Sequence, residues 1–253
     1  MNFDFSGKTA IVTGAAHGFG RAITLALAQH GAHVWACDVI EPELLETRRL
    51  CANGRCTTRV VDVSDKETVD TFVGDASAPA GHIDILVNNA GGVLGQVGRA
   101  LEEVMPDEWQ CIFDVNVTGA FYFSQAVAPG MKAARAGRII NISSGAGLGI
   151  SLTGIQAYAS AKAAQIGLTR QLAHELGPWG ITVNNIAPGF VRSNPATERQ
   201  WESYGEDGQR ELIERIALKR LGTADDIAYG VLFFASDYAK WITGQVISID
   251  GGK

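Results

Sequence analysis

The stretch Thr13-Gly14-Ala15-Ala16-His17-Gly18-Phe19-Gly20 decides the fold of this chain. It follows an apolar run at residues 8–13 that predicts a strand, and it opens a helix predicted over residues 18–29. Glycines at such a turn let the backbone bend tightly, so that a pyrophosphate can reach the helix N-terminus. The spacing is Gly-x-x-x-Gly-x-Gly, not the common Gly-x-Gly-x-x-Gly. A turn that only packs the helix on the strand is the alternative.

The alternation of strand and helix continues along the chain. Further strands are predicted at residues 32–38, 60–63, 83–87, 138–142, 181–186 and 246–249. Helices are predicted at residues 42–52, 106–134 and 156–176, and the first of these ends at Asn53-Gly54. A capping box of Ser64 with Glu67 begins another helix that continues to about residue 78, and a cap formed by Thr223 with Asp226 begins the last one. Strict alternation with apolar strands favours a parallel sheet covered on both faces. We therefore expect an α/β fold over residues 1–253, a single doubly wound Rossmann-type domain with a mostly seven-stranded parallel sheet.

One segment, at about residues 190–217, departs from this alternation. It is polar and charged, and it carries Arg192, Arg199, Trp201 and Tyr204. Insertions after the carboxyl end of a strand lie where ligands bind in open α/β sheets. We predict a helical lid over a substrate; a solvated surface excursion is the alternative.

Composition excludes several classes of function. With 253 residues, 46% of them hydrophobic, and a formal charge of −6, the chain lacks the basic stripe that nucleic acid requires. No apolar run reaches a membrane-spanning length, and the N-terminus shows no export signal. Cys37, Cys51, Cys56 and Cys111 have no Cys-x-x-Cys or Cys-His spacing, so free thiols and no metal site are expected. A soluble cytoplasmic protein is the expectation.

Asp38 ends the second predicted strand, about twenty residues after the glycine-rich turn. A carboxylate there can accept hydrogen bonds from an adenosine ribose and would repel a 2′-phosphate, so NAD is expected rather than NADP. His17 could soften this preference by protonation, although its ordinary pKa near 6.5 leaves it mostly neutral. A carboxylate that only caps a turn is the alternative.

Tyr158 and Lys162 are four residues apart in a stretch of good helix formers. Positions i and i+4 share one helix face. An ammonium one turn away favours the phenolate, whose ordinary pKa is near 10, so the pair can exchange protons at lower pH. Two partly exposed helix residues are the alternative.

Five motifs in order give the chain a family resemblance. They are the glycine pattern of residues 14–20, Asn88-Asn89-Ala90-Gly91, Ser143-Ser144, Tyr158-x-x-x-Lys162 and Pro188-Gly189. In order and approximate spacing, over nearly the whole chain, they resemble the short-chain dehydrogenase/reductase family. The resemblance implies hydride transfer between a secondary alcohol and a nicotinamide cofactor.

The resemblance also implies cofactor contacts. They are Gly14, His17, Gly18, Phe19, Gly20 and Asp38 around the adenosine and pyrophosphate; Asp62 and Val63 at the adenine; Asn89, Ala90 and Gly91 at the adenosine ribose; Tyr158 and Lys162 at the nicotinamide ribose; and Pro188, Gly189, Val191 and Ser193 at the carboxamide. Asn89 could instead be purely structural, and the family usually carries Thr where Ser193 stands.

The implied catalytic set is Asn116, Ser144, Tyr158 and Lys162. Tyr158 would take the hydroxyl proton, Lys162 would lower the phenol pKa, Ser144 would hold the substrate oxygen, and Asn116 would hold a water that passes the proton out. A buried structural Asn116 is the alternative. Ser144 lies one residue further from Tyr158 than the family pattern has it.

The substrate itself is less determined. Ser144, Gln156, Tyr158 and Arg192 are the predicted substrate contacts, in a pocket formed by residues 147–156 and the lid. Their polarity favours a sugar, polyol or sugar acid. The alternatives are reduction of a 3-oxoacyl thioester and a non-catalytic relative that binds NAD without turnover.

A homotetramer is expected, because family members usually pair the helices that here carry Asn116 and Tyr158. These helices look apolar on more than one face, with Phe121, Phe123 and Val127 on one and residues 163 and 166–168 on the other. A monomer with a few exposed apolar residues is the alternative.

Overall fold

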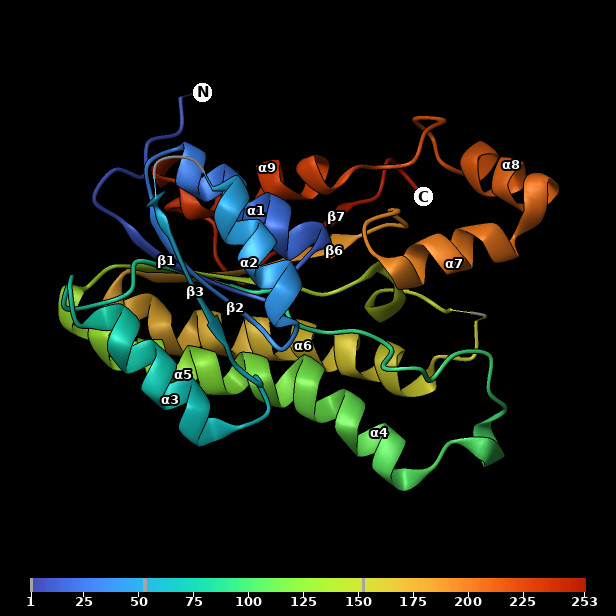
Figure 1. The fold of residues 1–253 in the computed structure, drawn as a ribbon, viewed down its shortest axis with the longest axis horizontal. Coiled ribbons are helices and arrows are strands. Elements are labelled where there is room, and N and C mark those ends of the chain that lie inside the picture. The colour runs from blue at the N-terminus through green and yellow to red at the C-terminus, as the bar shows by residue number, and fades with distance from the viewer. Residues whose placement is uncertain (1, 52–53, 152) are drawn as a thin grey trace.

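A seven-stranded parallel sheet forms the centre of the computed structural model, which describes residues 2–51, 54–151 and 153–253. The strand order is β3-β2-β1-β4-β5-β6-β7. Figure 1 shows the sheet nearly edge-on, with helices above and below it. The strands are β1 (Thr9–Thr13), β2 (His33–Asp38), β3 (Cys56–Val60), β4 (Ile85–Asn88), β5 (Gly137–Ile142), β6 (Ile181–Pro188) and β7 (Val246–Ile249). The predicted fold class is confirmed.

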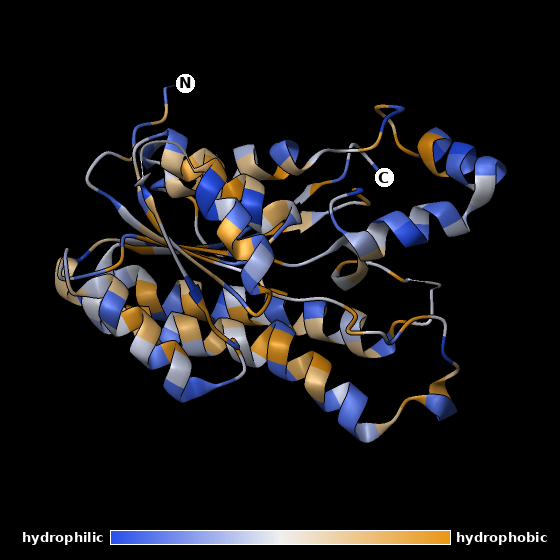
Figure 2. Ribbon diagram, in the orientation of Figure 1, coloured by the Kyte–Doolittle hydropathy of each residue, from blue (hydrophilic) through white to orange (hydrophobic). Residues whose placement is uncertain are grey.

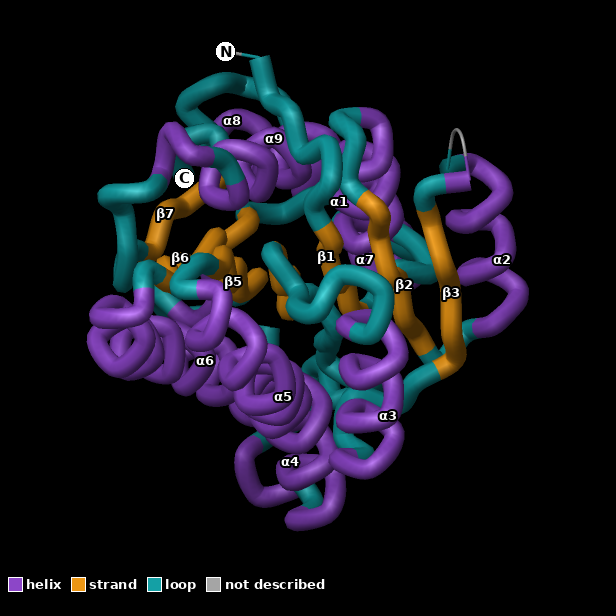
Figure 3. The backbone as a smooth tube through the Cα atoms, turned by 90° about the vertical axis from the view of Figure 1, so that its left-hand side faces the viewer, coloured by secondary structure: helices purple, strands orange, loops and turns teal. Residues whose placement is uncertain are grey.

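Helices cover both faces of the sheet. On one face lie α1 (Gly18–Gln29), α2 (Glu41–Leu50) and α9 (Ala224–Ala235); on the other lie α3 (Lys66–Ser77), α4 (Pro106–Phe113), α5 (Gly119–Ala134) and α6 (Gln156–Leu176). Figure 3 shows the strands between these two layers. Short turns of helix are η2 (Leu101–Glu103), η4 (Gly145–Gly147), η5 (Gly177–Trp179) and η6 (Asp237–Ala239), and η3 (Asp114–Thr118) is a π-helical turn.

Strand β1 shows how the sheet divides the core. Its five residues are all buried, because both faces are covered. Ala10 and Val12 belong to the apolar cluster under α1 and α9, whereas Ile11 belongs to the cluster under α3 and α5. Figure 2 shows apolar colour along the sheet and the inner sides of the helices, and a largely polar helix α7.

Strand β1 is also where the chain changes direction. It pairs with β2 on one side and β4 on the other, since the chain moves outward to β3 and then returns to start the second half of the sheet. In open α/β sheets, ligands bind beyond the carboxyl ends of the strands at this point. The segments that follow β1, β4, β5 and β6 therefore meet at one edge.

The third strand differs from the prediction. It covers Cys56–Val60, whereas residues 61–63 lie beyond it. The β-branched run misled the prediction because Val61 and Val63 are buried by side-chain packing outside the strand. In the part of the chain that the structure describes, strand β3 pairs with β2 alone, and an edge strand with half-exposed threonines needs no apolar run.

Two helix boundaries also differ. Asp65, not Ser64, caps α3, because its carboxylate accepts from the Glu67 and Thr68 amides. Helix α2 ends at Leu50; its predicted last residue, Ala52, and the predicted stop at Asn53 lie outside the described residues. The helical region predicted at 106–134 contains the π-helical turn η3 between α4 and α5.

The segment after β6 forms two helices, α7 (Pro195–Ser203) and α8 (Gly205–Arg215). Both of its ends are fixed to the body. Val191 forms a β-bridge with Gly222, and the Ala217 and Leu218 amides donate to the carbonyls of Gly252 and Gly251 at 3.2 and 3.1 Å. Across the described residues, none of the helices is both long and apolar enough to span a membrane.

Candidate active site

The glycine-rich turn after β1 is hydrogen-bonded to the residues that follow β4. Asn89 Nδ2 donates to the carbonyl oxygens of Thr13 and Gly14, both at 3.0 Å. Thr13 Oγ1 accepts from the amides of Asn89 and Ala90 at 3.1 and 3.0 Å. A Cβ on Gly20 would collide with the Gly14 carbonyl oxygen, so α1 packs on the turn only without a side chain there. The structural role considered for Asn89 is therefore present.

The N-terminus of α1 has its amides free of side-chain acceptors. His17 at the N-cap makes no capping hydrogen bond, and the first turn has no acidic residue. Gly18 has a φ of +57°, and a Cβ there would lie 2.9 Å from the Ser193 carbonyl oxygen. Phe19 packs against the apolar core. An open helix N-terminus beside glycines fits the pyrophosphate of a dinucleotide.

Asp38 lies at the end of β2 beside this turn. Its Oδ2 accepts from the Ala16 amide at 2.9 Å, and its Oδ1 accepts from the Val39 and Ile40 amides at 2.7 and 3.1 Å. The turn-capping role is thus present. Three N–H bonds leave about one lone-pair position of the carboxylate for a ligand hydroxyl.

Asp62 and Val63 lie one strand further out. The Asp62 carboxylate is exposed and accepts from the Ser64 amide and hydroxyl at 2.9 and 2.6 Å. Val63 is buried against Gly119 of α5, where a Cβ would clash with it. These positions border the edge of the sheet at which the turn and Asp38 lie.

Two further residues, one on α1 and one on α2, form hydrogen bonds to the glycine-rich turn, and neither was predicted as a site residue. The Thr47 hydroxyl donates to the Ala15 carbonyl at 2.8 Å. Arg21 donates to the Ala16 carbonyl, and it pairs with the Glu43 carboxylate at 2.7 Å. No motif predicts them; only the packing of α2 on the turn brings them together.

The catalytic candidates converge on Lys162. Its Nζ is buried and donates to the Ile142 carbonyl at 2.9 Å, at the end of β5. A Cβ on Gly91 would collide with Asn116 Oδ1 and would lie 3.0 Å from Lys162 Nζ. The Tyr158 ring lies 5.6 Å from the same nitrogen. The loop after β4, the turn η3 and helix α6 therefore meet here.

Asn116 sits in the π-helical turn η3 and is fully buried. Its Nδ2 donates to the carbonyls of Ile112 and Gly92 at 2.8 and 3.0 Å, and its Oδ1 accepts from the Gly92 amide at 3.1 Å. These bonds offset the poor helical tendency of Asn. A π turn inside a helix is frequent at functional sites, because it re-aims one side chain.

The proton chemistry of the pair differs from the expectation. Burial raises the pKa of the Tyr158 phenol, and the hydrogen bond with Ser144 lowers it in part. Burial lowers the pKa of Lys162 to about 7. Desolvation disfavours the charged form of each group, so without ligands it outweighs the ammonium effect that the sequence predicts.

Ser144 follows β5 and caps η4, its Oγ accepting from the Ala146 amide at 3.2 Å. Gly147 packs on α6, where a Cβ would lie 2.7 Å from the Lys162 carbonyl carbon. The short turn η4 thus begins directly after Ser144 and packs on α6 at Lys162.

The loop after β6 forms a further side of the candidate site and lies opposite the glycine-rich turn. Pro188 ends β6, and the Gly189 amide donates to the Ile249 carbonyl at 3.0 Å. Val191 is buried, and the Ser193 amide is held by Thr197 Oγ1 at 3.0 Å. The position of Ser193 opposite Gly18 brings this loop over the glycine-rich turn.

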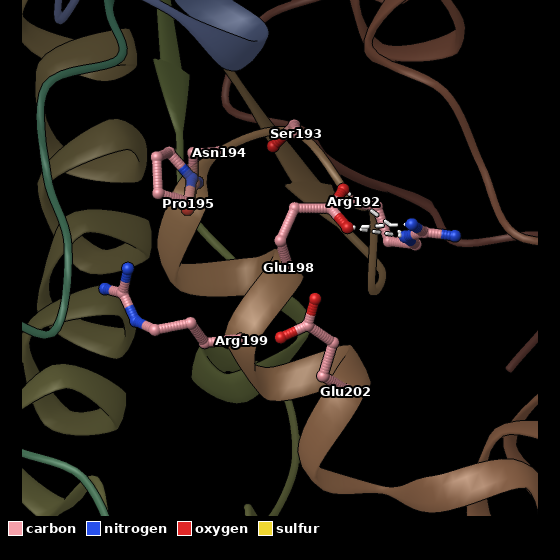
Figure 4. Close-up of a pocket in the computed structure, with 7 residues that line it drawn as sticks. All are labelled: Arg192, Ser193, Asn194, Pro195, Glu198, Arg199 and Glu202. Atoms are coloured by element: carbon pink, nitrogen blue, oxygen red, sulfur yellow. Dashed lines mark hydrogen bonds and ion pairs between the residues drawn. The ribbon is translucent and has the colours of Figure 1, made fainter.

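The two predicted substrate residues outside the catalytic set are already engaged. Gln156 Nε2 donates to the Arg99 carbonyl at 2.9 Å. The Arg192 guanidinium pairs with Glu198 at 2.8 Å and lies 5.4 Å from the Trp201 ring. In Figure 4, Arg199 extends to the opposite side of α7 from Arg192.

A cavity of about 630 Å³ lies along α7. Its lining residues are Arg192, Ser193, Asn194, Pro195, Glu198, Arg199 and Glu202 (Figure 4). Ser193 is the one predicted cofactor contact among them. The cavity belongs to the segment after β6 and does not include Tyr158 or Lys162.

Below the catalytic group, three asparagines are aligned across β4, β5 and β6. Asn88 Nδ2 donates to Asn141 Oδ1 at 2.8 Å, and Asn141 and Asn185 both donate to Thr169 Oγ1, at 2.8 and 3.3 Å. An asparagine inside an apolar strand was a visible signal, because a buried amide needs partners.

A doubly wound sheet with a glycine-rich turn at its switch point and a Ser, Tyr, Lys and Asn at the carboxyl edge defines a dinucleotide-binding oxidoreductase. Residues 14–253 match the family described as enoyl-(acyl carrier protein) reductase. The chain belongs to the short-chain dehydrogenase/reductase family, as the motifs indicated.

The similarity to known proteins extends over almost the full length of this chain. The chain is 38% identical to a 3-oxoacyl-[acyl-carrier-protein] reductase FabG of Thermotoga maritima, over 97% of each chain. It is 39% identical to the (2S)-[(R)-hydroxy(phenyl)methyl]succinyl-CoA dehydrogenase subunit BbsD of Thauera aromatica, over 97% of this chain and 96% of that one. A levodione reductase structure superposes with a TM-score of 0.91 at 30% identity, covering 98% of this chain and 97% of that one.

Proposed function

We propose that the protein is an NAD-dependent oxidoreductase that interconverts a secondary alcohol and a ketone on a small polar substrate. The observation that carries the reaction is the convergence of Lys162, Asn116 and Tyr158 at the carboxyl edge of the sheet. A relative that binds NAD without turnover would not need these groups together.

The residues fit a dinucleotide. The uncapped N-terminus of α1 would hold its pyrophosphate, and the remaining lone pair of Asp38 would accept from the adenosine ribose. Arg21 lies close to this turn, but it already pairs with Glu43. The carboxylate of Asp38 would repel a 2′-phosphate, and Arg21, because it is already paired, would not offset that repulsion. Both features support NAD over NADP.

The reaction follows from the groups around the substrate oxygen. When bound, the nicotinamide ring would accept or return the hydride of the carbinol carbon. Tyr158 would take the hydroxyl proton in oxidation and give it back in reduction. Ser144 would hydrogen-bond the same oxygen, and Lys162 as an ammonium would stabilise the phenolate. Asn116, whose side chain ties η3 to Gly92, would fix the far side of Lys162 and, with a water, would pass the proton to solvent.

The polarity of the surrounding segments supports a sugar, polyol or sugar acid. Arg199 carries no ion pair among the described residues and could meet an acidic group on the substrate. The names of two relatives, a 3-oxoacyl-[acyl-carrier-protein] reductase and a [hydroxy(phenyl)methyl]succinyl-CoA dehydrogenase subunit, favour a second candidate, a thioester with a 3-oxo or 3-hydroxy group.

Assembly and location stay predictions. Phe123, Val127 and Ile166 pack inside one chain, so this part of the tetramer argument was wrong. Exposed apolar residues on and before α4 and α5 support a homotetramer instead; they are Leu101, Met105, Trp109 and Phe121. The cytoplasmic location rests on the sequence alone.

A substrate panel tests the proposal. Sugars, sugar acids, polyols, aliphatic alcohols and a 3-oxoacyl thioester would be assayed with NAD and NADP separately, by the absorbance of reduced nicotinamide. Turnover of a polar alcohol with NAD supports the proposal. Turnover of the thioester alone with NADPH would establish the second candidate, and no turnover with any compound would contradict both.

A further inference from the structure

Gln165 makes a contact with the catalytic lysine that the reaction described above does not use. It lies three residues after Lys162 on α6, and its Oε1 accepts from Lys162 Nζ at 3.3 Å. Its side chain is fully buried, with 0% exposure. The Ile142 carbonyl at 2.9 Å is the other acceptor of the same nitrogen among the described residues.

The amide of Gln165 is held at a cost to folding. While Oε1 faces Lys162, Nε2 has no hydrogen-bond partner and is sealed from solvent. A buried unpaired N–H is unfavourable, and an apolar side chain of the same shape would avoid it. Packing alone therefore does not explain a glutamine here.

The surroundings of Lys162 leave Gln165 as a main source of support for the charge. Tyr158 is the titratable group that faces it from α6. The groups from β5, η3, η4 and the loop after β4 are neutral: the Ile142 carbonyl, the Asn116 amide, the backbone of Gly147 and Gly91. Among residues 2–51, 54–151 and 153–253, Lys162 forms no ion pair.

We propose that Gln165 is a positioning residue that holds Lys162 as an ammonium, and thereby sets the share of enzyme with a Tyr158 phenolate. This inference rests on the proposed function. An acceptor on an ammonium favours its charged form. With one proton removed, the pair exists either as phenol with amine or as phenolate with ammonium, and the second form is the active one in oxidation. Loss of the acceptor shifts the balance toward the first form.

The kinetic consequence is specific to this role. At low pH Tyr158 and Lys162 are both protonated. The active form then arises when Tyr158 loses its proton beside an ammonium that is already present, so loss of the Gln165 acceptor does not change the amount of active enzyme. At high pH the two singly deprotonated forms compete, so the variant loses activity. Gln165→Met, which keeps the shape and removes the acceptor, should match the native enzyme at low pH and fall about tenfold below it at high pH.

The test combines this profile with a readout that needs no turnover. The Lys162 amine would be followed by NMR of enzyme with ¹⁵N-labelled lysine, its signal assigned by its loss in Lys162→Met. In cofactor-free enzyme, Gln165→Met should lower the titration midpoint by about one pH unit. Gln165→Glu, which keeps an acceptor and adds charge, should raise it, and serves if Gln165→Met does not fold.

Thr24→Val is the matched control, because Thr24 is a buried residue of α1 whose hydroxyl also lacks a partner. It should leave the midpoint and the shape of the profile unchanged. An unchanged Lys162 midpoint in both Gln165 variants, or a rate loss that is equal at every pH, would overturn the inference. If no alcohol in the panel reacts, the proposed function fails while the NMR result still decides the role of Gln165.

Discussion

Burial raises the pKa of the Tyr158 phenol and lowers that of the Lys162 amine, so it disfavours the charged form of each group. Burial therefore opposes the phenolate–ammonium form that the proposed reaction uses. The positive charge of an oxidised nicotinamide and the bonds to Ser144 and Gln165 are what can reverse the balance. Three residue-level predictions follow from this site and its neighbours.

Removal of the phenol tests the base. Tyr158→Phe should lower kcat for alcohol oxidation by a factor of 10² to 10⁴, the usual contribution of a positioned base. Binding of NAD should be nearly unchanged, because the turn and Asp38 are untouched. Steady-state kinetics and calorimetric titration with NAD measure the two effects. Native-like turnover in this variant would remove Tyr158 from the mechanism.

Asp38→Asn tests the cofactor preference. The amide keeps an oxygen acceptor for the backbone and loses the charge that repels a 2′-phosphate. The ratio of kcat/KM for NAD to that for NADP should fall at least tenfold. Adding Glu43→Gln should lower it further, because Arg21 then lacks its carboxylate partner. A ratio that stays constant in both variants would show that Asp38 does not select the cofactor.

Lys162 should make folding depend on pH. Its pKa is about 7 when folded against an ordinary 10.5, so between these values the unfolded chain binds more protons. The free energy of unfolding should therefore rise with pH from 7 to 10, by at most about 1.4 kcal/mol per pH unit. Urea unfolding at several pH values measures this slope.

Lys162→Met should flatten that rise and increase stability near neutral pH, at the expense of activity. The exposed Lys240→Met is the matched control and should keep the slope. Equal slopes in the native protein and in Lys162→Met would mean that the lysine titrates as it does in the unfolded chain.

At the scale of elements, helix α9 offers the clearest test of a local rule. Thr223 Oγ1 accepts from the Asp226 amide at 3.3 Å, and the Asp226 carboxylate accepts from the Thr223 amide at 2.8 Å. Thr223→Ala should lower the free energy of unfolding by about 1 kcal/mol without changing the urea m-value. Thr223→Ser should retain most of the stability. A loss in Thr223→Ser as large as in Thr223→Ala would point to the methyl group and not to the cap.

The elements also show what the sequence could and could not predict. Helix α9 and its cap were predictable because both partners are local. Strand β3 was misplaced because an edge strand with half-exposed residues lacks the apolar run that marks the inner strands. The π-helical turn at Asn116 was not predicted, since it depends on hydrogen bonds to Gly92, far away in sequence.

The same distinction holds for the site. Motifs after successive strands predicted which loops would meet at the carboxyl edge, because parallel topology brings strand ends together. Gln165, Arg21 and Thr47 were missed. Their roles come from side-chain contacts across helices, and no spacing in the sequence encodes these.

At the scale of the whole molecule, the segment predicted as a lid is held together by aromatic contacts. The Phe190 ring lies 6.2 Å from Trp201 and 5.8 Å from Tyr204, and Arg192 lies over Trp201. Trp201→Ala should loosen α7 and α8, raise KM for the substrate several-fold and speed tryptic cleavage at Arg210 and Arg215. The melting temperature should change little, because the main core does not include the lid.

Trp241→Ala is the matched control, since Trp241 is 96% exposed and lies outside the lid. It should leave KM and the cleavage rate as in the native enzyme. Unchanged KM and cleavage in Trp201→Ala would mean that the segment is a surface excursion, the alternative considered from the sequence.

The two fixed ends of the α7–α8 segment, at the Val191 bridge and at the pairing of residues 217–218 with 251–252, restrict how it can move. Because both ends are attached, the segment cannot detach at one end while the other stays in place. If it acts as the substrate lid that the sequence predicts, it would have to open between these two attachments, and release of the product would wait for that opening. Turnover would then be paced by that opening, and solvent viscosity would slow the enzyme even where the hydride step is fast.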